Sequence, residues 1–189
     1  MRRQDPDRDK MKDPAVAEAA VEPDSLPLAA DECGEFPIRI ARDGVWFYQG
    51  SPIGRKELAR LFSTVLRRDG EGRFWLVTPV ERGLIQVDDA PFTAVELAAE
   101  GEGKETILRF RNNFDDWVTA GPDHPIAVTF DPDSAEPSPY IRIRDNLDAL
   151  IVRSVFYELV ALAESVARNG RTVLGVWSDG VFFELGESG

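Results

Sequence analysis

Arginine side chains with strand spacing are the residues of this sequence whose types and positions could do chemistry. Arg109 and Arg111 alternate with apolar residues, and so do Arg142 and Arg144. Residues two apart on a strand lie on one face, so each pair should share a face. If the two strands are neighbours, four guanidinium groups line one surface and can hold a phosphate or carboxylate. The alternative is cross-strand pairing of these arginines with Asp or Glu.

A second basic group lies in residues 54–73, which hold six basic and three acidic residues, a local charge of +3 in a chain of −12. The six are Arg55, Lys56, Arg60, Arg67, Arg68 and Arg73. Such a cluster can hold an anion by charge-assisted hydrogen bonds, and Arg68 is its candidate for ligand binding. Alternatively, the cluster complements the C-terminus of a helix and solvates its outer face.

Arg153, Tyr157 and Glu164 form a polar stripe at i, i+4 and i+11 of a predicted helix. The stripe could face a cleft, where Arg153 holds an anion and Tyr157 stacks or donates a hydrogen bond; its alternative is the solvent side of the helix. The candidate ligand-binding residues are therefore Arg68, Arg142, Arg144, Arg153 and Tyr157.

Catalytic and metal-binding motifs of high specificity are not found in the sequence. Glu81, Asp88, Asp89 and the single histidine, His124, would support a metal-assisted hydrolase if their side chains converged. The alternative is that they are ordinary turn residues. We therefore predict no catalytic residue, no metal and no cofactor, and we expect binding rather than catalysis.

Composition limits the class of protein and its partners. The chain has 189 residues, 43% of them hydrophobic, which is enough for a substantial core. A net charge of −12 opposes binding to nucleic acid and to anionic lipid. The sequence contains no apolar run long enough for a signal peptide or a membrane span. With Cys33 as its single cysteine, the chain is expected to be soluble and cytoplasmic, with no membrane or nucleic-acid partner.

The chain divides into a tail and two subdomains, predicted at 1–34, 35–94 and 95–189. The tail is proline-rich and acidic and lacks aromatic residues, so it is expected to be disordered. In the first subdomain we predict a hairpin around Asp43-Gly44 and a helix whose buried face is formed by Leu58, Leu61, Phe62, Val65 and Leu66. A second hairpin follows at 73–87.

The second subdomain is predicted to contain more strand. Alternating segments near 106–112, 117–120, 125–131 and 140–145 are typical of strands. A long, largely buried helix is predicted over 147–168, ending before Gly170, and a hairpin over 171–185. The predicted fold class is α+β, with two related subdomains that each pack a long helix on an antiparallel sheet.

Two internal similarities bear on how the chain is built. The stretch "DGVWFYQG" at 43–50 returns as "DGVFFELG" at 179–186, but the copies lie on opposite sides of the two predicted helices. We interpret this pair as shared hairpin chemistry. Residues 73–87 and 171–185 both follow a predicted helix and a glycine and both begin with an arginine, at an offset of 98 positions. This second pair leaves open a duplication of a strand-helix-hairpin unit.

Long runs of the sequence resemble a known bacterial family, catalogued as domain of unknown function 1285. They include "DGVWFYQGSPIGRKELARLFSTVLRRD", "FWLVTPVE", "PYIRIRDNLDALIVRSVFYELVALA" and "LGVWSDGVFFELG". The resemblance covers about residues 36–186. It implies a duplicated core, a second half like pleckstrin-homology domains, a ligand site where the halves meet, a nucleotide-like ligand and a role in signal transduction. It implies no role for any single residue.

The expected function is therefore non-enzymatic binding of a small anionic ligand, nucleotide-like by the resemblance, between two subdomains. One alternative is a protein-protein adaptor that uses a sheet edge or hydrophobic patch. The other is the metal-assisted hydrolase.

Overall fold

The computed structural model of the chain describes residues 33–168 and 170–187, and residues Asp31–Gly189 form one compact unit. The predicted disordered tail lies outside the described residues, except that Cys33 and Gly34 already belong to a strand. We refer to residues 33–87 as the N-terminal half and to residues 92–187 as the C-terminal half.

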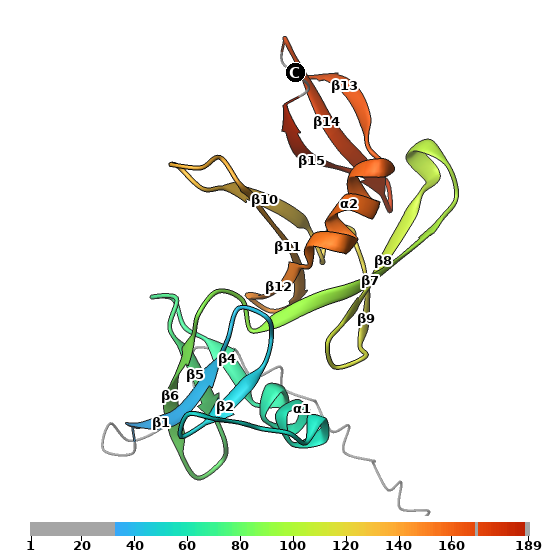
Figure 1. Cartoon of the computed structure of the whole chain (residues 1–189). Helices are drawn as coiled ribbons and strands as arrows, with labels where there is room; N and C mark the ends of the chain where they lie inside the picture. The colour runs from blue at the N-terminus through green and yellow to red at the C-terminus, as the bar shows by residue number, and fades with distance from the viewer. Residues whose placement is uncertain (1–32, 169, 188–189) are drawn as a thin grey trace, which may run out of the picture. The chain divides into compact units, whose positions relative to one another are not determined.

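The N-terminal half is one six-stranded sheet with a helix beside it (Figure 1). Its elements are β1 (Cys33–Ile40), β2 (Trp46–Tyr48), β3 (Ser51–Pro52), α1 (Lys56–Thr64), β4 (Leu66–Arg68), β5 (Phe74–Val77) and β6 (Arg82–Val87). The strand order is β3-β2-β1-β6-β5-β4, and β1 pairs with β6 in parallel. The predicted hairpins around Asp43-Gly44 and within 73–87 are confirmed by the β1–β2 and β5–β6 pairs.

The C-terminal half begins with a second six-stranded sheet, in the order β10-β11-β12-β7-β8-β9. Its elements are β7 (Phe92–Glu100), the 3-10 turn η2 (Gly103–Glu105), β8 (Ile107–Asn112), β9 (Trp117–Thr119), β10 (Ile126–Phe130), β11 (Pro137–Arg144) and β12 (Leu147–Ile151). Strands β7 and β12 pair in parallel at its centre. The sequence patterns predict β8 to β11 but not β7, whose alanine, leucine and glutamate residues favour helix.

The chain ends in α2 (Arg153–Ala161) and a three-stranded antiparallel sheet of β13 (Glu164–Arg168), β14 (Arg171–Ser178) and β15 (Val181–Glu187). The predicted hairpin over 171–185 is thus confirmed. In both halves a helix is followed by three consecutive antiparallel strand segments, which gives two similar units of mixed α+β structure.

The long helix predicted over 147–168 is wrong, because this segment folds as β12, the nine-residue α2 and β13. In β12, Leu147, Ala149 and Ile151 are buried and alternate with less buried residues, which is the period of a strand. An apolar-rich segment satisfies both helical and strand spacing, and pairing of β12 with β7 and β11 selects the strand.

The predicted buried face of the first helix is confirmed in part, because Phe62 and Val65 pack against the core. Ala59 and Ser63 are the buried residues of α1, whereas Leu61 is 62% exposed. Leu66 is buried, but it lies in β4 and pairs with Leu76. At this face the Ser63 carbonyl accepts a hydrogen bond from Arg144 of the C-terminal half.

The two "DGV" turns share their chemistry but not their geometry. Asp179 and Gly180 both have positive φ, as a two-residue hairpin between β14 and β15 requires. At the first turn Gly44 has φ +83°, and a Cβ there would lie 3.0 Å from Thr93 and Asn113 side-chain atoms. Glycine at position 44 therefore also permits close contact between the two halves.

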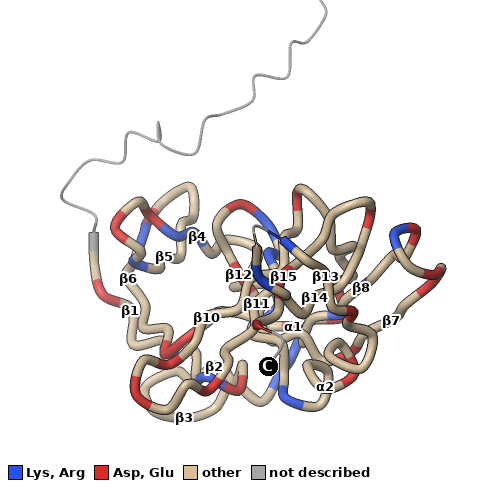
Figure 2. Tube along the Cα trace, turned by 90° about the horizontal axis from the view of Figure 1, so that it is seen from above, with Lys and Arg blue, Asp and Glu red and all other residues tan. Residues whose placement is uncertain are grey.

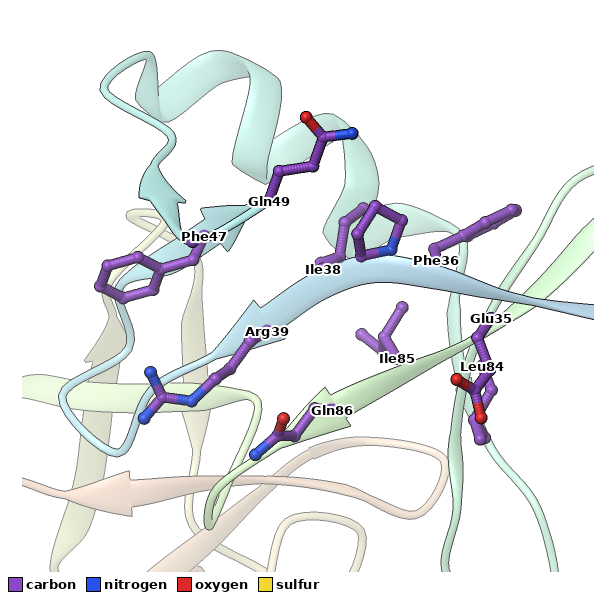
Figure 3. Close-up of a pocket in the computed structure, with 11 residues that line it drawn as sticks. Glu35, Phe36, Ile38, Arg39, Phe47, Gln49, Leu84, Ile85 and Gln86 are labelled. Atoms are coloured by element: carbon purple, nitrogen blue, oxygen red, sulfur yellow. The ribbon is translucent and has the colours of Figure 1, made fainter.

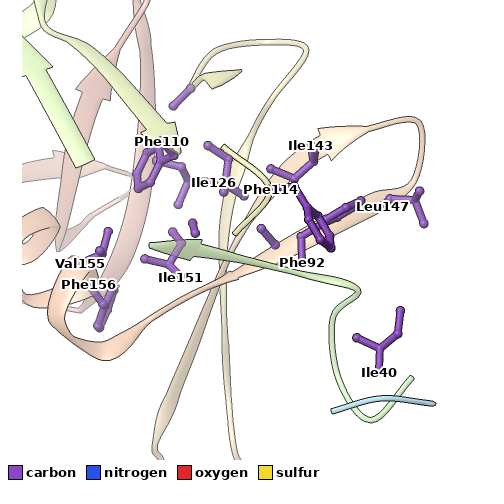
Figure 4. Close-up of a cluster of buried hydrophobic side chains, with 14 of the residues drawn as sticks. Ile40, Phe92, Phe110, Phe114, Ile126, Ile143, Leu147, Ile151, Val155 and Phe156 are labelled. Carbon is purple, nitrogen blue, oxygen red and sulfur yellow. The ribbon is translucent and has the colours of Figure 1, made fainter. Parts of the chain in front are cut away.

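The hydrophobic core is continuous across both halves. Trp46 and Phe92 each pack against Phe114, with ring centroids 6.4 and 6.1 Å apart. Figure 4 shows Phe92 and Phe114 close to Ile143 and Leu147 within this core. Among the described residues, no helix is long and apolar enough to cross a bilayer.

Candidate functional site

A pocket of about 360 Å³ lies where α1 meets the second sheet, and we call it the interhalf pocket. Residues from α1, β7, β8, β9, β11 and the turn after β8 line it: Arg60, Ser63, Thr64, Phe92, Asn112, Asp116, Val118, Ile143 and Arg144. Of these lining residues, Ser63, Phe92 and Ile143 are buried. Both halves of the chain thus contribute to one pocket.

Asn112 supplies a buried hydrogen-bond donor that lacks a partner. The residue is 1% exposed, and its Oδ1 accepts hydrogen bonds from the backbone amides of Phe114 (2.8 Å) and Asp116 (3.0 Å). These two bonds fix the orientation of the side-chain amide. Its Nδ2 then finds no acceptor within the described part of the chain, a condition shared by the indoles of Trp46 and Trp177 elsewhere. An unpaired buried donor is unfavourable, and a ligand acceptor in the pocket would satisfy it.

Arg144 places a half-buried guanidinium in the same pocket. It donates to the Ser63 carbonyl and lies 5.8 Å over the Phe92 ring. Burial, and then the nearby charge of Arg67, lower the pKa of Arg144. Within residues 33–168 and 170–187, no carboxylate forms an ion pair with Arg144. An anionic ligand would therefore be attracted to this group.

Two ion pairs connect α1 to the turn between β8 and β9 beside the pocket. Arg60 pairs with Asp116, and Lys56 pairs with Asp115, each at 2.6 Å. All four side chains are about half exposed, so each pair contributes little to stability and can open. Asp116 is thus a carboxylate that competes with any anion for Arg60.

Arg142 and Arg144 are two residues apart on β11 but have different surroundings. Arg142 pairs with Asp148 at 2.5 Å and donates to the Asp145 carbonyl, outside the interhalf pocket. The register between β11 and β12 shifts between these two arginines. Buried Ile141 and Ile143 still alternate with the less buried Arg142 and Arg144, so the two arginines keep the expected face but have different partners there.

Arg68, Arg153 and Tyr157 also lie outside the lining of the pocket. Arg68 lies over the Phe74 ring at 5.2 Å. On α2, the Arg153 Nε donates to the Tyr157 hydroxyl at 2.7 Å, which raises the pKa of Arg153. The polar stripe does not continue to Glu164, because that residue lies in β13. The structure brings Arg153 and Tyr157 together, but not with Arg144.

The condition for a surface of four guanidinium groups is not met, because β12 and β7 separate β11 from β8. Arg109 pairs with Glu100, and Arg111 pairs with Glu96 at 2.6 Å and with Asp115 at 2.6 Å. Cross-strand pairing therefore explains these two arginines. Figure 2 likewise shows Lys and Arg interspersed with Asp and Glu along the described chain.

The residues of the hydrolase hypothesis have separate partners. Asp88 pairs with Arg39, Asp89 pairs with Arg42, and the His124 Nδ1 lies 3.0 Å from the Arg142 carbonyl oxygen. In the part of the chain that the structure describes, no three His, Cys, Asp or Glu residues are grouped so that they could hold a metal ion.

A larger groove of about 660 Å³ lies on β1, β2 and β6, where the register of β1 against β6 shifts between Glu35 and Arg39. Figure 3 shows Arg39 and Gln86 near Phe47 at one end of this groove and Glu35 near Leu84 at the other. The Arg39 guanidinium is held by both oxygens of Asp88, and this pairing lowers the pKa of Asp88. The positive charge that Arg39 brings to this groove is thus already neutralised by Asp88.

Sequence reasoning missed Phe92, Asn112 and Asp116 as residues of the pocket. One signal was available for Asn112, which continues the alternation of Leu108 and Phe110 and so falls on the buried face of β8. A polar residue at a position where the strand pattern expects an apolar one indicates either a side chain that hydrogen-bonds a neighbouring turn or a functional site. The Asn112 side-chain oxygen accepts hydrogen bonds from the turn, and among the residues that the structure describes its nitrogen has no partner.

Comparisons with known proteins identify relatives for nearly all of the described chain. Residues 28–90 match the family model described as "Domain of unknown function (DUF1285), N-terminal domain", and residues 91–185 match "Protein of unknown function (DUF1285), C-terminal domain". A search of curated proteins found no match.

Two crystal structures are similar to this chain. A DUF1285 family protein from Silicibacter pomeroyi DSS-3 is 47% identical, with a TM-score of 0.75 over 82% of this chain and 81% of that one. A DUF1285 family protein from Shewanella baltica OS155 is 24% identical, with a TM-score of 0.53 over 67% and 91% of the two chains, which shows a shared fold.

Proposed function

Since this chain belongs to the DUF1285 family, whose name assigns no activity, we propose a function from its own residues: non-enzymatic binding of a small anionic ligand in the interhalf pocket. The observation that carries this proposal is that Asn112, whose buried Nδ2 has no hydrogen-bond partner among the described residues, lines the same pocket as Arg144. Two donors without a carboxylate partner favour an anion. Arg144 is the member of the predicted ligand-binding set that lines this pocket.

The proposal includes the wider role that the resemblance implies. Binding would take place in the cytoplasm and would report the ligand level to a signalling pathway. The C-terminal half, a six-stranded sheet followed by a helix, supports a pleckstrin-homology-like character as part of the same proposal.

Thermal unfolding of the full chain with and without small anions tests the binding site. Benzoate, inorganic phosphate and AMP are the probes, and a ligand that binds the folded state raises the midpoint by mass action. We expect at least one probe to stabilise the protein and Arg144→Gln to abolish the shift. Arg142→Gln, the same change two residues away but outside the pocket, should keep it. No stabilisation by any probe, or an equal loss in both variants, would contradict the proposal.

A second candidate function, a protein-protein adaptor, is favoured by an apolar groove of about 390 Å³ between α1 and the β2–β3 hairpin. Ile38, Tyr48, Ser51, Pro52, Ile53, Leu58 and Phe62 line it. On the same helix as Leu58 and Phe62, Leu61 is 62% exposed. A partner that binds here should be lost with Leu61→Asp and kept with Leu162→Asp, an exposed leucine just after α2, in a binding assay with both purified proteins.

A further inference from the structure

The charges around the interhalf pocket leave one positive charge uncompensated, and the inference drawn from them rests on the proposed function. Arg60 is paired with Asp116 at the edge of the pocket. The charged residues that line the pocket are Arg60, Arg144 and Asp116. Two guanidinium groups therefore meet one carboxylate, so the lining has a net charge of about one positive unit at neutral pH. A single negative charge would neutralise it.

The walls of the pocket are polar on one side and apolar on the other. Asn112 and Arg144 supply the donors, while Phe92, Val118 and Ile143 supply an apolar surface. Phe92 and Ile143 are 2% and 7% exposed, so Val118, which is half-buried, supplies most of the accessible apolar surface and the core behind it holds it in place. The volume of about 360 Å³ is near the lower end of small-molecule pockets, ~300–1,000 Å³.

We propose that the ligand of this pocket is a monoanionic carboxylate with an aromatic or other apolar body. One carboxylate oxygen accepts from the Asn112 Nδ2 and the other from the Arg144 guanidinium. The apolar body packs against Phe92, Val118 and Ile143. The charge of a phosphate dianion, including the phosphate of a nucleotide, is larger than the positive charge of the pocket. Its binding would leave a net negative charge in a partly desolvated site, which is unfavourable.

Asp116 sets this selectivity, because it neutralises Arg60. Removing its charge leaves two positive charges uncompensated, which suits a dianion. The variant Asp116→Asn keeps the shape of the side chain, and Asp115→Asn is its matched control. Asp115 is the neighbouring residue and pairs with Lys56 and Arg111, but it does not line the pocket.

Calorimetric titration of the full chain with benzoate and with AMP, at constant ionic strength and neutral pH, tests the inference. We expect the wild-type chain to bind benzoate at least about tenfold more tightly than AMP, a difference of ~1.4 kcal/mol. Asp116→Asn should raise the affinity for AMP about tenfold and reverse or abolish the preference. Asp115→Asn should leave the preference unchanged.

Asn112→Asp separates failure of this inference from failure of the proposed function. This variant keeps the Oδ acceptor for the Phe114 and Asp116 amides but replaces the donor by a repelling oxygen. If AMP binds the wild-type chain more tightly than benzoate and Asn112→Asp abolishes binding, the anion site stands and the monocarboxylate assignment is overturned. Equal effects of the Asp115 and Asp116 variants would also overturn it. If neither probe binds, or Asn112→Asp binds as the wild type does, the proposed site itself is wrong.

Discussion

The α1 unit (α1, β4, β5 and β6) and the α2 unit (α2, β13, β14 and β15) have the same order of elements but use their helices differently. Helix α1 begins at residue 56 and α2 at residue 153, 97 positions later. The buried residues of α1 are Ala59 and Ser63, whereas those of α2 are Val155, Phe156 and Leu159. Large side chains fill the space under α2. Small ones leave room beside α1, and the interhalf pocket lies there.

The sheets of the two units differ as well. Strand β6 pairs with β1 in parallel and so joins the first unit to a six-stranded sheet. Strand β15 pairs with β14 within a separate three-stranded sheet. The same order of a helix and three strand segments thus occurs in two different sheet arrangements. The side chains that contact the helix determine whether it packs in the hydrophobic core, as α2 does, or lines a pocket, as α1 does.

The largest expected difference between the two units is in the loss of stability when one leucine of each helix is truncated. Leu159 of α2 is fully buried, so Leu159→Ala should destabilise the protein by about 2–5 kcal/mol through lost contacts and a cavity. Leu61→Ala on α1 should change the free energy of unfolding by less than about 0.5 kcal/mol, since that side chain is exposed. Urea unfolding of both variants measures the difference. Similar losses would show that α1 is a core helix too.

A smaller effect is expected from a methyl group at a strand glycine of each unit. A Cβ at Gly175 in β14 would lie 2.4 Å from the backbone oxygen of Phe183, whereas at Gly83 in β6 it would meet the Phe36 ring at 2.5 Å. Backbone in a sheet cannot move as a side chain can, so Gly175→Ala should cost about 1–3 kcal/mol and Gly83→Ala less. Thermal unfolding compares them. A larger loss for Gly83→Ala would mean that Phe36 is fixed in place.

The smallest expected effect is a pH dependence that arises in the α1 unit. Burial would raise the pKa of Asp69, but hydrogen bonds from Trp75, Arg73 and backbone amides outweigh it and hold this pKa well below its usual range. The corresponding turn of the α2 unit, Arg-Asn-Gly-Arg at 168–171, has no acid. A carboxyl with a lowered folded-state pKa stabilises the protein above its unfolded value of about 3.9, and this stability is lost as the pH falls.

Asp69→Asn should therefore lower the unfolding midpoint by a few degrees at about pH 7, and the difference from the wild type should shrink below about pH 4. Glu71→Gln, which removes an exposed partner of Arg73, is the control and should have little effect at any pH. If the unfolding midpoint of Asp69→Asn stays equally far below that of the wild type in acid, the charge of Asp69 is not the cause of the stabilisation.

Local sequence patterns determined most of the hairpins and the α+β class. The Asp-Gly turns and the alternation in 73–87 and 171–185 depend on neighbours within a few residues, and the structure has strands there. Residues 147–168 were mispredicted because their apolar residues fit two periods. The choice between those periods depends on pairing with β7, which is distant in sequence and was not itself predicted.

The sequence by itself determined the family, the order of most elements and Arg144 as a ligand-binding candidate. Tertiary structure alone decided that β12 and β7 separate the arginine strands, that Arg142 and Arg144 have different partners, and that Asn112 and Phe92 share a pocket with α1. The physical reason is that strand order, register and helix contacts depend on the free energy of long-range packing. Residue spacing along a segment specifies the face on which each side chain lies, but not which other strand or helix packs against that face.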